Sequence, residues 1–83
     1  MIKVNVFQAH RDSTTSYKQC FCVLSTTLRE ILKENNVPEA GANVYVNGKY
    51  MKPENWKVSF QELQASNPTF ISVKHGEEPP KKK

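Results

Sequence analysis

A single helix with a signal at each end most limits how this chain can fold. Thr27 and Glu30 have the spacing of a capping box, in which hydroxyl and carboxylate each satisfy a free backbone donor. At the other end, Asn36 can take the left-handed conformation that closes a helix, and Pro38 forbids continuation. Residues three and four apart form the inner stripe between these signals: Leu28, Ile31, Leu32 and Asn35. We therefore expect one helix between about residues 27 and 36.

The segments around this helix are patterned for strands. Residues 1–9 alternate between apolar and polar side chains, and residues 17–24 form a second strand after a polar turn. Residues 43–46 and 69–75 are two more strands, separated by a loop at 53–57 and a short helical turn. The side chains expected to face the core from outside the helix are Ile2, Val4, Val6, Val58, Phe60, Leu63, Ile71 and Val73.

The dipeptide Asn47-Gly48 predicts a two-residue hairpin turn of type I′. Both central residues of such a turn need positive φ, which Asn and Gly tolerate best. The expected register pairs Val46 with Lys49, Tyr45 with Tyr50, and Val44 with Met51. Val44 and Met51 then face inward, and the two tyrosines form an outer aromatic pair.

The second strand allows two registers that differ by one residue. One turns Cys20, Cys22 and Leu24 inward, and the other turns Gln19, Phe21 and Val23 inward. Bulk favours Phe21 in the core, whereas the same register would also bury Gln19, and free cysteine is among the most buried residue types. We expect Cys20 and Cys22 to be buried and Phe21 to lie on the outer face.

Length and charge narrow the class of protein. Eighty-three residues make one domain with a thin core. Of the net charge of +4, the tail contributes +1, and the +3 of the body comes from dispersed lysines and arginines without interleaved aromatics at a motif spacing, which argues against a nucleic-acid binder. No apolar run approaches a membrane span, and the alternating N-terminus is unlike a signal peptide. We interpret the chain as a cytoplasmic protein with a mature start.

The chemistry-bearing residues do not form a catalytic or metal-binding pattern. Cys20 and Cys22 lie in mid-strand, and a structural zinc site usually needs four ligands with paired cysteines on turns. His10 and His75 fall near the ends of strands that should be neighbours, but no acidic or nucleophilic residue accompanies them. We interpret them as ordinary surface histidines. Trp56 is interpreted as a loop residue that covers the core rather than as a stacking platform.

Gly76 marks the expected boundary between the folded domain and a C-terminal tail. Residues 77–83 contain no hydrophobic side chain and two consecutive prolines, so a disordered tail is expected after a domain of residues 1–76.

The order of these elements resembles the ubiquitin-like β-grasp superfamily. The likeness rests on the helix entry at 27–32, the hairpin at 44–49, the segment Phe60–Leu63 and the strand residues 71–73. Val46–Lys49 and Pro53–Trp56 look most like the bacterial sulfur-carrier proteins of thiamine and molybdopterin synthesis. The resemblance implies an α+β fold, a ubiquitin-like β-grasp with a mixed four- to five-stranded sheet packed on one helix.

The C-terminal residues depart from the sulfur-carrier pattern. Such carriers, and conjugated ubiquitin-like proteins, act through a flexible Gly-Gly whose carboxylate is adenylated. Here Gly76 is followed by Glu77, Glu78, Pro79 and Pro80. A carrier or protein modifier would therefore require proteolytic removal of residues 77–83, and this is the alternative hypothesis.

The function expected from the sequence is a non-catalytic ubiquitin-like module, a monomer in a bacterial cytosol that binds a protein partner. An accessory subunit of an enzyme complex belongs to this class. No cofactor, metal, nucleic acid or membrane is expected to take part. Aromatic and basic side chains suit an interface, so the candidate binding residues are Phe21, Tyr45, Lys49, Tyr50, Phe70 and Lys74.

Overall fold

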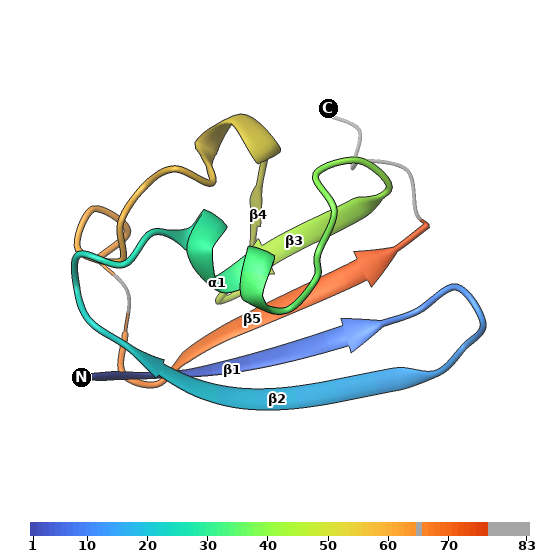
Figure 1. Cartoon of the computed structure of the whole chain (residues 1–83), viewed down its shortest axis with the longest axis horizontal. Helices are drawn as coiled ribbons and strands as arrows, with labels where there is room; N and C mark the ends of the chain where they lie inside the picture. The colour runs from blue at the N-terminus through green and yellow to red at the C-terminus, as the bar shows by residue number, and fades with distance from the viewer. Residues whose placement is uncertain (65, 77–83) are drawn as a thin grey trace.

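A computed structural model describes residues 1–64 and 66–76 of the chain (Figure 1). Its elements in chain order are β1 (Ile2–Ala9), β2 (Thr15–Cys22), α1 (Leu28–Glu34), β3 (Ala42–Val46), β4 (Lys49–Met51), the 3₁₀ helix η1 (Pro53–Asn55) and β5 (Thr69–His75). The prediction of a disordered tail concerns residues 77–83, which lie outside the described residues.

The strands form one mixed sheet in the order β2-β1-β5-β3-β4. The central strands β1 and β5 are parallel, and the other three pairings are antiparallel. Helix α1 crosses one face of this sheet (Figure 1). The predicted α+β architecture is confirmed, with five strands and one α-helix in the described part of the chain.

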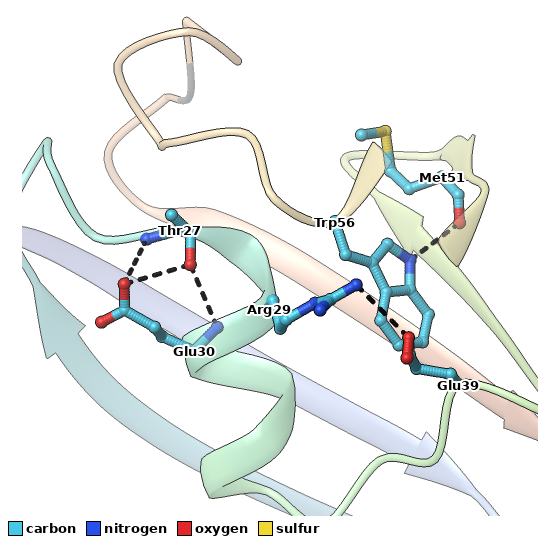
Figure 2. A network of polar contacts seen from close by, with 6 residues as sticks. All are labelled: Thr27, Arg29, Glu30, Glu39, Met51 and Trp56. Atoms are coloured by element: carbon cyan, nitrogen blue, oxygen red, sulfur yellow. Dashed lines mark hydrogen bonds and ion pairs between the residues drawn. The ribbon is translucent and has the colours of Figure 1, made fainter. Parts of the chain in front are cut away.

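Both predicted ends of the helix are present. The Glu30 N–H donates to Thr27 Oγ1 and the Thr27 N–H donates to Glu30 Oε1, each over 3.3 Å (Figure 2). At the other end Asn36 has φ +60°, and the Val37 N–H donates to the Leu32 carbonyl over 2.9 Å. This Schellman closure leaves α1 seven residues long, shorter than expected, because the capping residues lie outside the helix.

The core lies between α1 and the inner face of the sheet, which we define as the face toward the helix. The stripe Leu28, Ile31 and Leu32 is buried against aliphatic strand residues, including Val4, Val44 and Val73. Phe60 is fully buried, and Trp56 is 1% exposed with its Nε1–H donating to the Met51 carbonyl over 3.1 Å (Figure 2). Trp56 thus belongs to the core, as the sequence predicted.

The connection from β4 to β5 packs on the same side of the sheet as α1. The Leu28 and Arg29 N–H groups donate to the carbonyls of Val58 and Trp56, over 3.0 and 2.7 Å. The segment expected to be a loop at 53–57 contains η1, and the expected short helical turn is present after it, with the Leu63 N–H donating to the Ser59 carbonyl over 3.0 Å. Within residues 1–64 and 66–76, no helix is long and apolar enough to span a membrane.

The hairpin between β3 and β4 has the predicted register. Asn47 and Gly48 have φ values of +51° and +87°, as a type I′ turn requires. Val44 pairs with Met51 and Tyr45 pairs with Tyr50.

Strand β2 takes the register that turns its cysteines inward. Cys22 lies opposite Ile2 and is buried, whereas Cys20 lies opposite Val4 and is only partly buried. Phe21, between them, faces the other side and is 58% exposed. Leu24 was wrongly placed with the inward set, because the strand ends at Cys22 and the Leu24 side chain is half exposed.

Candidate functional site

The eight aromatic residues of the chain divide by location. Trp56 and Phe60 lie in the connection between β4 and β5 and are buried in the core. The other six lie in strands, and the pairing registers place all of them on the sheet face opposite α1. They are Phe7, Tyr17, Phe21, Tyr45, Tyr50 and Phe70. We call this face, with its two lysines Lys3 and Lys74, the outer face.

Four of the six aromatic residues form a row that crosses the whole sheet. Directly paired residues share a face, and the chain of pairs runs across the strands in the order Tyr17, Phe7, Ser72, Tyr45, Tyr50. The rings of Tyr45 and Tyr50 are 5.6 Å apart and tilted by 54°. We call this set the aromatic row.

Hydrogen bonds fix the residues beside the row. The Tyr17 hydroxyl and the Gln19 Nε2 both donate to Asn5 Oδ1, over 2.6 and 3.0 Å, so the Tyr17 ring is held over the sheet. The Phe70 N–H donates to Asn47 Oδ1 over 2.9 Å, which joins β5 to the hairpin turn. The aromatic side chains therefore project from hydrogen-bonded strands.

The outer face is open. In the described part of the chain, α1 and the β4–β5 connection lie on the inner side, and no helix or strand covers the outer face (Figure 1). Phe7, Tyr17 and Phe70 are 43%, 62% and 56% exposed. Exposed apolar side chains that are contiguous, rather than scattered, mark interaction sites on small proteins.

Five of the six candidate binding residues predicted from the sequence lie on this face. Phe21, Tyr45, Tyr50, Phe70 and Lys74 all lie there. Lys49 does not, because it pairs with Val46, which faces inward, and paired residues share a face. It is nevertheless exposed, since it lies at the end of the hairpin.

Two residues of the aromatic row were missed by the sequence reasoning. In β1, Phe7 lies on the same side as the outward residues Lys3 and Asn5. In β2, Tyr17 lies four residues before Phe21 and therefore on the same side of the strand. Strict alternation along each strand would have found both once the cysteines were assigned inward.

The two histidines, interpreted from the sequence as ordinary surface residues near the ends of neighbouring strands, are half-buried and lie against each other. Their rings stack with centroids 4.8 Å apart and planes 13° apart. His75 Nε2 lies 2.7 Å from Gln8 Oε1, and Gln8 Nε2 donates to the Asn35 carbonyl over 3.2 Å. Because the amide oxygen accepts, His75 Nε2 carries the proton. Burial, and secondarily the charge of His10, lowers the pKa of His75.

A shallow hollow of about 470 Å³ lies beside the end of α1. Leu32, Val37 and Trp56 line it, and the ion pair Arg29–Glu39, 3.3 Å long, lies at its edge beside the Trp56 ring (Figure 2). Both ionic side chains are more than half exposed, so the pair contributes little to stability.

Reactive groups are sparse in this structure. Burial raises the pKa of the Cys20 and Cys22 thiols, which keeps them protonated and poorly nucleophilic at neutral pH. Among residues 1–64 and 66–76, no three His, Cys, Asp or Glu side chains are grouped so as to hold a metal ion. The outer face is therefore the most distinctive candidate site that the structure describes.

Comparison with known proteins identifies the fold. No family model matches the sequence, and no curated protein is significantly similar to it. The structure is similar to a ubiquitin-like protein from the hyperthermophilic archaea Caldiarchaeum subterraneum, with a TM-score of 0.56 and 8% sequence identity. The match covers 95% of this chain and 100% of that chain. The chain therefore has a ubiquitin-like β-grasp fold, and a likeness at this identity concerns the fold alone.

Proposed function

We propose that this chain is a non-catalytic, monomeric binding module of the cytoplasm that docks a protein partner on the outer face of its sheet. The observation that carries the proposal is the location of every strand aromatic on the face that no helix or strand of residues 1–64 and 66–76 covers. Aromatic side chains supply large contact area at a small cost in conformational entropy, and they are enriched at protein interfaces.

The shape of the face supports a macromolecular partner over a small molecule. Small ligands bind in concave sites that enclose most of their surface. Two hollows in the described part of the chain lie elsewhere, beside the end of α1 and around His10 and His75. A sheet face with projecting rings instead fits an extended surface.

Site-specific photocrosslinking tests the proposal. A photoreactive phenylalanine analogue at position 70 would lie on the outer face, and the same analogue at position 33 would lie on the exposed side of α1. We expect a discrete protein adduct in host extract from position 70 and none from position 33. Adducts of equal yield from both positions, or from position 33 alone, would refute docking on the outer face.

The alternative, a sulfur carrier or modifier processed to Gly76, receives less support. The Gly76 N–H donates to the Gly41 carbonyl over 2.7 Å, and a side chain at position 76 would collide with Arg11. Gly76 is exposed but hydrogen-bonded to the folded body, whereas carrier chemistry needs a free glycine end that can enter an activating enzyme. Intact mass of the protein from its host tests this, since a species ending at Gly76, or its thiocarboxylate, would favour the alternative.

A further inference from the structure

Charge is distributed unequally between the sheet and the rest of the molecule. The five strands contain four lysines and no aspartate or glutamate. The remaining described residues contain five basic and six acidic side chains. The net positive charge of the described chain therefore resides in the sheet, and the carboxylates lie in α1 and the connections.

Two of the strand lysines lie at opposite ends of the outer face. Lys3 pairs with Phe21, and Lys74 pairs with Ala9, which is six residues further along β1. At about 3.3 Å per residue, the two backbone positions are about 20 Å apart along the strands. The aromatic row, at the level of Phe7, lies between them.

Neither lysine forms an ion pair within residues 1–64 and 66–76. In the part of the chain that the structure describes, the ion pair is Arg29–Glu39, and neither Lys3 nor Lys74 contacts a carboxylate. The Lys74 ammonium instead lies 5.6 Å from the centre of the Tyr45 ring, which keeps the cation beside the aromatic row.

We infer that the partner is a protein surface whose apolar centre is flanked by two acidic groups about 20 Å apart. The apolar centre would cover the aromatic row, and one carboxylate cluster would meet each lysine. Such complementarity accelerates encounter and excludes wrong partners, because juxtaposed like charges are costly. Face-to-face pairing of two copies of this chain does not fit, since the outer face of the described strands offers no carboxylate. This inference rests on the proposed function.

A defined probe tests the charge requirement. We would measure binding of a fluorescent glutamate–tyrosine copolymer, with a lysine–tyrosine copolymer and a twelve-nucleotide oligothymidylate as comparisons. The test variant is Lys3→Glu with Lys74→Glu. The matched control, Lys33→Glu with Lys57→Glu, makes the same change in net charge at exposed positions off the strands. Thermal melting verifies that each variant is folded.

We expect the protein to bind the glutamate–tyrosine copolymer. Its affinity should fall about tenfold or more in the test variant and less than about threefold in the control. Equal losses in both variants would mean that only net charge matters, and tighter binding of the oligothymidylate would make the face a nucleic-acid site. Either result overturns the inference.

Photocrosslinking separates failure of this inference from failure of the proposed function. If the adduct from position 70 persists unchanged in the Lys3→Glu, Lys74→Glu background, the outer face binds a protein but the acidic partner is wrong. If no adduct forms from position 70 even in the unaltered chain, the proposed function itself fails.

Discussion

The two faces of the sheet use different apolar residues. The buried part of the inner face is built mainly from aliphatic side chains such as Val4, Val44 and Ile71, and the aromatic residues of the core come from the β4–β5 connection. The outer face holds all six strand aromatics, although large rings usually contribute most to a core because they bury the most area. Under the proposed function, separate residues would serve folding and binding. Outer-face substitutions should therefore leave the fold intact.

The largest expected difference in stability between the two sets of aromatic residues is that between two phenylalanine substitutions. Phe60 is fully buried, whereas Phe70 is more than half exposed. Phe60→Ala should lower the free energy of unfolding by about 3–5 kcal/mol, from lost burial and the cavity left behind. Phe70→Ala should cost less than about 1 kcal/mol. Urea denaturation followed by circular dichroism measures both, and similar losses would show that the outer face is part of the stabilising core.

Replacing one core aromatic and one outer-face aromatic by phenylalanine, which removes the N–H or O–H donor, should have smaller effects on stability. Trp56→Phe removes the donor to the Met51 carbonyl and part of a fully buried ring, so the lost hydrogen bond and the cavity should together cost about 1–3 kcal/mol. Tyr50→Phe, on the outer face, should change stability by less than about 0.5 kcal/mol. The midpoint of urea unfolding gives both values, and a Tyr50 effect equal to that of Trp56 would contradict the comparison.

The turn that joins β3 to β4 holds Tyr45 and Tyr50 in register. Gly48 has φ +87°, which a β-branched residue adopts only under strain, so Gly48→Val should cost more than about 1 kcal/mol. Lys49→Val, at the next position in ordinary strand conformation, is the control and should cost much less. An unchanged melting temperature for Gly48→Val would mean that the turn relaxes without strain.

The parts of the fold that sequence predicted well are those specified by neighbouring residues. Thr27 with Glu30, Asn36 with Val37, and Asn47-Gly48 act through local backbone hydrogen bonds and φ preferences. Each was found where the sequence placed it.

The parts that sequence predicted poorly depend on contacts between distant segments. The outward position of Phe7 follows from the alternation of β1, but Tyr17 joins the aromatic row through the β1–β2 register, which two competing sets of β2 residues left open. Lys49 was chosen because basic and aromatic side chains together suit an interface, although its pairing with Val46 turns it to the inner face. The contact of His10 with His75 joins residues 65 positions apart, and no local pattern specifies it.

The smallest expected effect concerns the polar end of the inner face, where His75 stacks on His10. The unfolded chain protonates His75 near its ordinary pKa of 6.5, whereas burial lowers that pKa in the folded protein. Between these two values the unfolded chain binds more protons, so stability falls as the pH is lowered through this window. We expect the melting temperature to fall between pH 7.5 and pH 5.5.

The groups around His75 allow this fall to be assigned to its titration. Arg11 and Asp12 line the same hollow, and hydrogen bonds from Thr14 lower the pKa of Asp12, so the Asp12 carboxylate stays ionised throughout the window. His75→Gln removes the titrating ring and should flatten the pH dependence. His10→Phe keeps an aromatic ring in the stack but removes the second charge, so it should reduce the fall without abolishing it, since burial is the larger cause. A wild-type slope retained in His75→Gln would place the pH sensitivity in another group and leave the histidine stack a packing contact only.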